Sequence, residues 1–379
     1  MTTLQTLAGT LRVRPGLRRP HNLASDRRAL AGLLLAGRSA AEAPHLLANL
    51  FTLCGHAHFL CATLALAAAQ GQEAFASAAQ RRALRRETAR DHALRIGLDW
   101  PVELHVPGAM PAWADSSRTS LLGCPWLADG ARSKGDAEGI AWLADLLGAS
   151  PADWLALWER EPAEWLAQWS ERGRGWLPAL LHASAALGSR PLQPAAPLRP
   201  HGSPADLRAL ADGLGTAFDA AAPTWRGRCA ETGTWTRLHD LRADPPASAW
   251  ERLGARIADL ARLSLPDTPG RAGTGWLATG ALQTGTGEGL AWVETARGLL
   301  IHRARIEGPP ADRRVAGYDV VAPTDWNFHP LGAVAHALER MPAEGREAGP
   351  LLRILMAAYD PCVRFAVESR TATAELPHA

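Results

Sequence analysis

The stretch LFTLCGHAHFLCATLALAAAQG, from Leu50 to Gly71, contains two of the chain's five cysteines with two histidines between them. These residue types allow three interpretations: a metal site, a redox-active cysteine pair, or a buried helix that happens to contain sulfur. A structural zinc site needs a closely spaced C-x₂₋₄-C pair and a second pair of ligands downstream, and this stretch lacks that pattern. For each thiol taken alone, an inert buried cysteine is the alternative to a metal ligand.

Helical geometry separates the two cysteines of this stretch. Cys54 and Cys61 would lie about 10 Å apart at a rise of about 1.5 Å per residue, beyond the reach of a disulfide. On a helix, His58 would share the face of Cys54, whereas His56 would point elsewhere. Cys61, two turns on, would lie on a similar face. Cys61 and His58 are therefore further candidates for a metal pocket at Cys54, with a hydrogen-bonded core or surface position as the alternative for each histidine.

The composition argues against several functional classes. The chain has 40 Lys+Arg and 38 Asp+Glu residues and a formal charge of +2, so nothing indicates nucleic acid or an anionic membrane as a partner. The start, MTTLQTLAGTLRVRPG, lacks the apolar region of a signal peptide, and the longest apolar runs are expected to be too short to span a bilayer. Five scattered cysteines suit free thiols in a reducing compartment, so we expect a cytoplasmic protein.

The first hundred residues are expected to be mainly helical. Residues 26–80 follow a helical pattern, and Ser25 or Asp26 is the expected N-cap of its first helix. The run 59–70 is apolar nearly all round, which predicts a helix buried on every face. Residues 78–97 continue as an amphipathic helix with an arginine-rich face.

Strands are expected late in the chain. Segments 298–308 and 314–323 show β-branched alternation and are separated by a turn rich in Gly, Pro and Asp, which predicts a hairpin. A helix over 332–341 follows, and residues 349–370 form the last helix-like segment.

Tryptophans mark the middle of the chain. Trp154, Trp165 and Trp176 recur every eleven residues, and Trp158 and Trp169 follow the first two by four residues. A proline and a glycine interrupt this pattern, which favours short helices over one long helix. The tryptophans are expected to be buried core residues, with a partner-docking surface as the alternative.

The order of several stretches resembles the large, catalytic subunit of [NiFe] hydrogenases. In that family an N-terminal R-I-C-G-V-C-x-x-x-H and a C-terminal D-P-C-x-x-C-x-x-H supply four thiolates to a nickel–iron centre. Residues 37–61 resemble the first region, and residues 355–368 resemble the second. The resemblance implies that Cys54 and Cys362 correspond to the first cysteine of each pair. We therefore expect them to meet in the folded core as a two-thiolate metal site.

Other positions of these two motifs differ from the family pattern. Ala57 and Phe365 fall where the family has the two cysteines that bridge nickel and iron. Cys61 and Glu368 fall where it has histidines, the second of which binds a structural magnesium ion. The change argues against that ion, although a carboxylate can ligate magnesium, so Glu368 is a candidate for an altered magnesium site. The other two cysteines, Cys124 and Cys229, match no motif and are expected to be structural.

Three further segments resemble the family and imply a ligand pocket. LRIGLDWP places Asp99 as the acidic residue over the metal, and VETARGLLIHRARIEG places Arg297 above the iron. GYDVVAPTDWNFHP places Thr324 on a hydroxyl residue that, with Arg297, hydrogen-bonds the iron's cyanide ligands. Asp360, in YDPC, completes the pocket, where buried charges should pair with one another or with the ligand.

The lost residues imply that the protein does not turn over hydrogen. Without the two bridging thiolates, nickel and iron cannot be held as a hydrogenase holds them. The family's proton-gating glutamate falls on Ala8, and the chain ends soon after Glu368 without the extension that is cleaved during hydrogenase maturation. A degenerate paralogue with a half-kept pocket resembles the HupK/HoxV-type hydrogenase expression/formation proteins.

For that group, the resemblance implies a non-catalytic scaffold that transiently holds an Fe(CN)₂CO unit and no permanent nickel–iron centre. The expected partners are the [NiFe] hydrogenase large-subunit precursor and maturation chaperones of the HypC/HypD type, without nucleic acid or membrane insertion. Two alternatives remain open: a metal-free interaction module that binds the precursor or chaperones, and an oxidoreductase with an altered mononuclear metal site.

The resemblance also implies the fold. We expect an α+β, mainly α protein: a [NiFe] hydrogenase large-subunit-like helical core with a small C-terminal β-hairpin or sheet. A single domain is expected over 1–379, in which 1–100 and 286–379 form the two halves of the pocket. The Trp-rich helical middle, 101–285, contains a proline-rich, linker-like segment near 188–204.

Overall fold

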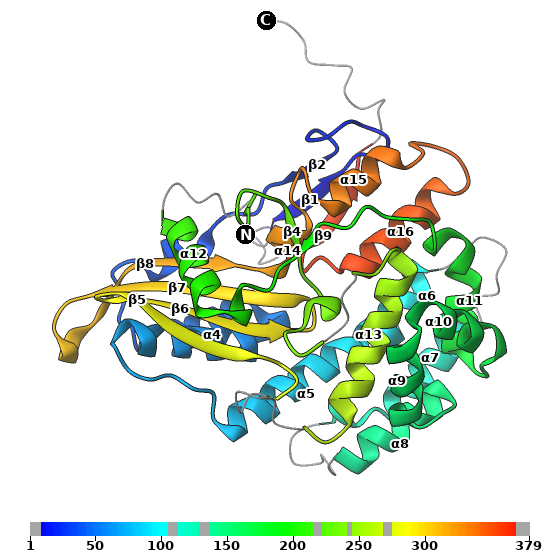
Figure 1. The fold of residues 1–379 in the computed structure, drawn as a ribbon, viewed down its shortest axis with the longest axis horizontal. Helices are drawn as coiled ribbons and strands as arrows, with labels where there is room; N and C mark the ends of the chain where they lie inside the picture. The colour runs from blue at the N-terminus through cyan, green and yellow to red at the C-terminus, as the bar shows by residue number, and fades with distance from the viewer. Residues whose placement is uncertain are drawn as a thin grey trace, which may run out of the picture.

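Two main sheets and a large group of helices make up the structure (Figure 1). The computed structural model describes residues 9–104, 113–128, 136–215, 222–240, 245–267 and 275–368. A four-stranded antiparallel sheet lies on one side of the molecule, and most of the helices lie on the other. A three-stranded sheet joins segments from near the two ends of the described chain. The fold is α+β and mainly α, which confirms the predicted class.

The first helix begins later than the sequence pattern predicted. Ser25 belongs to strand β2, and Asp26 accepts a hydrogen bond from the backbone N–H of Thr10, so neither residue caps a helix. The chain becomes helical only at Leu30. The elements of this region are β1 (Thr10–Val13), β2 (Leu23–Ser25), α2 (Leu30–Leu35), α3 (Ala43–Leu50), the 3-10 helix η1 (Thr52–Cys54), α4 (Gly55–Ala69) and α5 (Ala78–Leu94).

Helix α4 is a core helix of the protein. Ten of its 15 residues are buried, and it packs across strands β6 and β7 of the large sheet (Figure 1). Together with η1 it forms an apolar stretch of 18 residues, Thr52–Ala69, which is long enough to cross a membrane. The expectation that every apolar run is too short was therefore wrong. More than half of this stretch is buried inside the protein, as in the core helix of a protein in water.

The large sheet is a meander of four strands in chain order: β5 (Thr279–Gly285), β6 (Glu288–Thr295), β7 (Gly298–Glu307) and β8 (Arg314–Val321). The predicted hairpin corresponds to β7 and β8 and is confirmed. Strands β5 and β6 were not predicted, because their glycines obscure the alternating pattern. Packing explains the glycine at position 289. A side chain there would collide with the backbone of α4 at Ala65, so Gly289 lets the helix approach the sheet.

The last helix ends where the sequence analysis expected it to continue. Helix α16 spans Ala348–Tyr359, and Asp360 after it has a φ of 47°, a left-handed conformation that ends the helix together with Pro361. Residues Arg364–Val367 then form strand β9, which pairs in parallel with β1. This pairing brings the segment around Cys362 beside the N-terminal part of the chain.

The tryptophans of the middle segment are core residues. Trp154, Trp158 and Trp169 are at most 5% exposed and lie on α9 (Pro151–Arg160) and α10 (Pro162–Arg172). The rings of Trp154 and Trp158 stack with centroids 5.8 Å apart, and Trp169 meets Trp154 edge-on at 5.4 Å. Successive short helices therefore explain the spacing, and burial favours the core interpretation.

The proline-rich segment near 188–204 is packed against the fold and is not a free spacer. Its strand β3 (Ala196–Pro197) pairs with β4 (Ala230–Glu231), and Leu198 is fully buried. The His201 ring lies 3.0 Å from the carboxylate of Glu294 on β6. These contacts connect the middle of the chain to the large sheet.

Helix α13 (Ala249–Ser264) passes through the helical side and carries buried charged residues, among them Arg252, Arg256 and Asp259.

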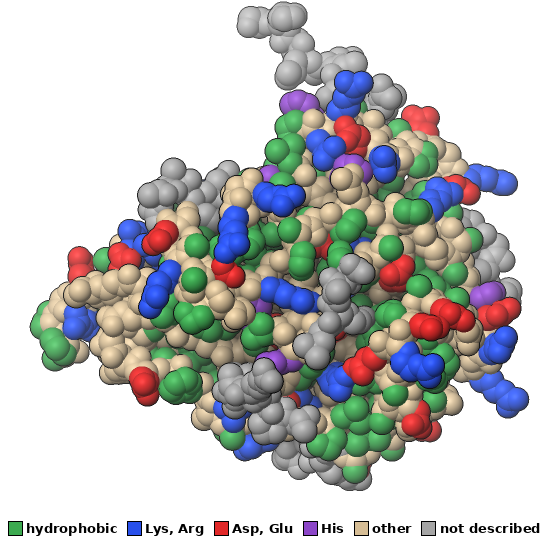
Figure 2. Space-filling view, in the orientation of Figure 1, with side chains coloured by type: hydrophobic (Ala, Val, Ile, Leu, Met, Phe, Trp, Pro, Cys, Tyr) green, Lys and Arg blue, Asp and Glu red, His purple; other side chains and the backbone are tan. Residues whose placement is uncertain are grey.

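On the surface, basic and acidic side chains are interspersed over the face shown in Figure 2, in keeping with the balanced net charge. The remaining described elements are η2 (Arg95–Asp99), α6 (Trp100–Glu103), α7 (Trp113–Leu122), η3 (Pro125–Leu127), α8 (Asp136–Leu147), α11 (Trp176–Gly188), η5 (Pro200–Gly202), α12 (Pro204–Gly215), η6 (Thr234–Thr236), η7 (Pro310–Asp312), α14 (Pro323–Asn327) and α15 (Ala333–Arg340).

Candidate functional site

Segments from near opposite ends of the chain position the two candidate thiols. Cys54 ends η1 and is the N-cap residue of α4, and its backbone N–H donates to the carbonyl of Phe51 over 3.1 Å. Cys362 follows the turn at Asp360 that ends α16, just before β9. Both are free cysteines and both are partly buried.

Thr324 holds the sulfur of Cys362. Its hydroxyl donates to Cys362 Sγ over 3.1 Å and accepts the backbone N–H of Cys362 over 3.2 Å. The threonine lies on the short helix α14, where Asp325 accepts the backbone N–H of Ala322 over 2.8 Å and fixes the first turn. This hydrogen bond fixes the position of a sulfur that could bind a metal as a thiolate.

The two thiols share one electrostatic environment. Burial raises the pKa of the Cys54 thiol, and the positive charge of Arg297 lowers it. The thiolate of Cys362 and the carboxylates of Glu87 and Asp91 raise this pKa further. The charges of Arg297 and Cys362 therefore both act on the ionisation of Cys54.

Asp360 is the centre of a buried ion-pair cluster. Its carboxylate faces three guanidinium groups: Arg95 at 2.7 Å, Arg256 at 2.9 Å and Arg297 at 3.2 Å. Burial raises the pKa of Asp360, but Arg297, Arg95 and Arg256 lower it to about 2, so the carboxylate is ionised at neutral pH. Arg297 pairs in addition with Asp91 at 2.5 Å. The buried charges thus pair with one another, and these pairs fix the guanidinium of Arg297 beside the thiols.

Asp99 is not the acidic partner of Arg297. It ends η2, pairs with Arg95 at 2.6 Å and leaves 38% of its side chain exposed. The acidic residues that contact Arg297 are Asp360 and, on α5, Asp91. The sequence offered one signal for it, because Glu87 and Asp91 are four residues apart and must project from one face of the helix.

Glu87 closes the N-terminus of α4, next to Cys54. Its carboxylate accepts the backbone N–H of His56 over 2.7 Å and that of Ala57 over 2.9 Å. It therefore accepts hydrogen bonds from backbone N–H groups that have no partner within the helix. It also lies at the helix N-terminus, where the positive end of the helix dipole stabilises a negative charge. Ala57 falls where the hydrogenase motif has its second cysteine. At this position the carboxylate of Glu87 accepts the backbone N–H instead.

His58 and Cys61 belong to the core behind the thiols. His58 Nδ1 lies 3.0 Å from His302 Nε2, and His302 Nδ1 lies 2.8 Å from the hydroxyl of Tyr318. Cys61 is fully buried, with its Sγ 4.0 Å from the carbonyl oxygen of Leu300 on β7. Among the described residues, no group of three or more His, Cys, Asp or Glu side chains could hold a metal ion. The prediction that Cys61 and His58 join the metal ligands is therefore not supported.

Glu368 is a salt-bridge residue beside the three-stranded sheet. Its carboxylate contacts Arg14 at 2.5 Å and lies 3.8 Å from Arg12. Its backbone N–H donates to the carbonyl of Val13 over 3.0 Å. Two guanidinium groups neutralise this carboxylate, which argues against a cation there, and the altered magnesium site at Glu368 stays a prediction.

The other two cysteines lie apart from this site. Cys124 is buried against Leu121 and Ala93, and Cys229 Sγ lies 3.3 Å from His329 Nδ1. Ala8, where the proton-gating glutamate of the hydrogenases would fall, lies outside the described residues.

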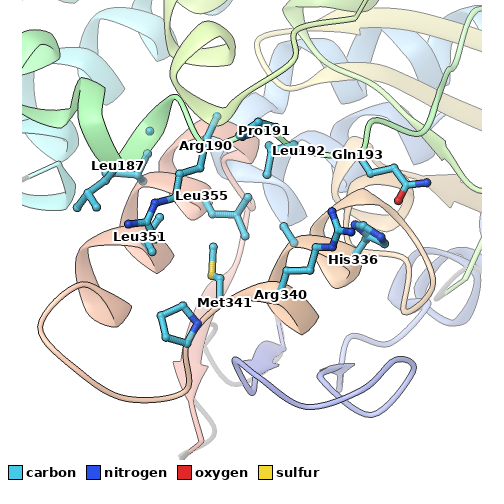
Figure 3. A pocket seen from close by; sticks show the side chains of 15 residues that line it. Leu187, Arg190, Pro191, Leu192, Gln193, His336, Arg340, Met341, Leu351 and Leu355 are labelled. Carbon is cyan, nitrogen blue, oxygen red and sulfur yellow. The ribbon is translucent and has the colours of Figure 1, made fainter.

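A cavity of about 220 Å³ lies between the end of α11, the proline-rich segment and helices α15 and α16. Figure 3 shows that Leu351, Leu355 and Met341 line it with apolar side chains, while Arg190 and Arg340 extend along it. None of the candidate site residues lines this cavity.

The fold is that of a hydrogenase large subunit. The structure resembles the [NiFeSe]-hydrogenase of Dm. baculatum with a TM-score of 0.51 and 16% identity, over 89% of this chain and 92% of that one. It also resembles the NAD⁺-reducing [NiFe]-hydrogenase in its H₂-reduced state, with a TM-score of 0.50 and 16% identity over 88% and 90% of the two chains. At this identity the likeness shows the fold alone. No family model matches the sequence.

Sequence relatives identify the family. The chain is 42% identical, over the full length of both proteins, to the hydrogenase expression/formation protein HoxV of Cupriavidus necator. It is 31% identical to HupK of Bradyrhizobium diazoefficiens over 89% of this chain and 90% of that one, and 30% identical to HupK of Azotobacter vinelandii over 88% and 90%. The chain therefore belongs to the HupK/HoxV-type hydrogenase expression/formation proteins, which confirms the predicted family and a role in hydrogenase maturation.

Proposed function

We propose that the protein is a non-catalytic scaffold that binds the Fe(CN)₂CO unit between Cys54 and Cys362 and passes it to the [NiFe] hydrogenase large-subunit precursor. The proposal is supported by the hydrogen bond that Thr324 donates to Cys362 Sγ and by the charges of Arg297 and Cys362, both of which act on Cys54. The names of the relatives support a role in forming a hydrogenase and not in its turnover.

The side chains around the thiols suit an iron that carries cyanide. Thiolates are soft ligands and bind iron well. Cyanide ligands carry negative charge and accept hydrogen bonds, and the guanidinium of Arg297 is a buried donor held in place by Asp91 and Asp360. Unpaired burial of an anion is costly, so this cation lowers the cost of taking the iron unit out of water.

The small number of thiolates suits transfer better than permanent binding. Ala57 and Phe365 stand where the hydrogenase motif has bridging cysteines, and neither side chain can bind a metal. An iron held through two sulfurs dissociates more easily than one held through four. The same loss leaves no bridging ligands for nickel, which argues against hydrogen turnover.

The binding step can be tested by infrared spectroscopy of the protein purified together with its maturation partners. We expect cyanide and carbonyl stretches in the wild type and their loss in Cys54→Ala and Cys362→Ala, while Cys124→Ala keeps them. If the wild type lacks these bands and both variants still support full hydrogenase maturation, the scaffold proposal is wrong. Iron-free protein that supports maturation would instead favour the metal-free interaction module.

Catalysis needs a separate measurement, because binding of iron does not exclude it. Hydrogen-dependent dye reduction by the purified, iron-loaded protein would support the oxidoreductase alternative, and we expect none.

The proposed partners are the large-subunit precursor and chaperones of the HypC/HypD type in the cytoplasm. We expect the tagged protein to co-purify with the precursor only while the precursor lacks its metal centre.

A further inference from the structure

A cavity of about 350 Å³ opens next to the segment that leads from β2 into α2, and Thr324 is one of its lining residues. Its walls come from that segment, from Phe51 after α3, from β8 and from α14. The volume lies within the range of about 300–1,000 Å³ that is typical of small-molecule sites. Of the residues that the sequence analysis assigned to the ligand pocket, Thr324 lines this cavity.

The cavity adjoins both cysteines through residues that contact them. Thr324 lines it, and the hydroxyl of Thr324 lies 3.1 Å from Cys362 Sγ. Phe51 lines it as well, and the carbonyl of Phe51 accepts the backbone N–H of Cys54 over 3.1 Å. An iron unit bound by both sulfurs would therefore have this space beside it for its diatomic ligands.

Arg27 is the cation of this cavity that acts on the thiols. Its guanidinium pairs with Asp325 on α14 at 2.5 Å. Burial lowers the pKa of Arg27, but the charges of Cys362, Asp325 and Cys54 raise it above its usual value, so the side chain stays a cation. A guanidinium has five N–H donors, and the hydrogen bond to Asp325 uses one of them.

The charge of the cargo calls for more than one cation. Ferrous iron with two cyanides and two thiolates carries two negative charges, and a partly buried site must compensate them. Arg297 already shares its charge with Asp91 and Asp360. Arg27 comes from a different segment of the chain and has donors left for a ligand in the cavity.

We propose that Arg27 is a second ligand-recognition residue of this site, which donates a hydrogen bond to one cyanide of the bound iron unit in the 350 Å³ cavity, while Arg297 serves the other. The inference rests on the proposed function, because it assumes that the two thiols bind this unit. It adds a recognition residue that the resemblance to hydrogenases did not supply.

The test compares Arg27→Met with Arg18→Met, because Arg18 is an exposed arginine that does not line the cavity. Each variant is purified with its maturation partners, and infrared spectra give the occupancy of the iron unit and the cyanide frequencies. Loss of one charge-assisted hydrogen bond should lower the occupancy of Arg27→Met by about ten- to a hundredfold under subsaturating conditions and shift the remaining cyanide bands. Arg18→Met should match the wild type, and Arg27→Lys should recover part of the occupancy.

Removing Arg27 leaves Asp325 without its partner, so the double variant Arg27→Met/Asp325→Asn removes both charges and separates recognition from folding. Circular dichroism and thermal melting verify that each variant is folded. Wild-type occupancy with unchanged cyanide frequencies in a folded variant without Arg27 would overturn this inference and leave the proposed function intact. Absence of the bands from the wild type would overturn the proposed function, and this inference with it.

Discussion

Asp91 on α5 and Arg297 in the turn between β6 and β7 form an ion pair across 206 residues of sequence, with 2.5 Å between carboxylate oxygen and guanidinium nitrogen. The pair links the helical side of the molecule to the large sheet. It also holds the Arg297 side chain, which is almost fully buried, beside Cys54. The position of Arg297 therefore depends on where α5 lies relative to the turn between β6 and β7.

Replacement of Arg297 by methionine should strongly destabilise the protein, because Asp91 would remain partly buried without its partner. We expect a loss of about 3–5 kcal/mol in the free energy of unfolding, measured by urea denaturation. The double variant Arg297→Met/Asp91→Asn should recover part of this loss. Arg118→Met is the matched control, since Arg118 is 70% exposed and its pair with Asp115 should contribute less than about 1 kcal/mol. Equal losses in the two single variants would contradict the buried pair.

Thr324→Val should weaken iron binding while it keeps the shape of the side chain. The variant removes the hydroxyl that donates to Cys362 Sγ, and Thr324→Ser keeps it. We expect about a tenfold loss of iron-unit occupancy in the valine variant, because a hydrogen bond to a charged sulfur contributes about 1.5 kcal/mol. The serine variant should stay near the wild type. Similar occupancy in both variants would show that the hydroxyl has no role.

Glu87→Gln should loosen the start of α4 next to Cys54. The carboxylate caps two backbone N–H groups and interacts with the helix dipole, so we expect a loss of about 1 kcal/mol in the free energy of unfolding. The exposed Glu73 provides the control variant Glu73→Gln, which should change stability by less than about 0.5 kcal/mol. Hydrogen exchange at the amides of His56 and Ala57 should rise in Glu87→Gln only.

His302 should make the protein sensitive to mild acid. Burial lowers the pKa of His302 to about 3, whereas an unfolded histidine titrates near about 6.5. Below pH ~6.5, His302 binds a proton in the unfolded chain but stays neutral in the folded protein. The free energy of unfolding therefore falls as the pH drops toward ~3. One such residue contributes up to about 1.4 kcal/mol per pH unit within this window.

Urea denaturation between pH ~6.5 and ~4.5 can measure this effect. His302→Gln should flatten the loss of stability in this range, because the glutamine does not titrate. His21→Gln, at an exposed histidine, should leave the slope unchanged. A wild-type slope in His302→Gln would contradict the assignment.

The sequence was informative where the signal is local. Helix α5 and the β7–β8 hairpin follow from periodicity within the segment itself, and Cys54, Cys362 and Thr324 stand in recognisable motifs. Sequence patterns did not predict the features that depend on contacts with distant segments of the chain. Residues 364–367 form a strand and not a helix, because β1 supplies its hydrogen bonds. Helical spacing placed Cys61 on a face similar to that of Cys54, but packing turns Cys61 toward β7.

By itself the sequence determined the family of the protein, its mainly helical character and the identity of the two candidate thiols, because these depend on residue types and their order. Only the tertiary structure decided that Asp91 rather than Asp99 faces Arg297, and that the carboxylate of Glu368 is already engaged by arginines. The reason is that ion pairs form between whichever side chains the packing of distant elements brings within a few ångströms. Spacing along one segment cannot reveal such partners.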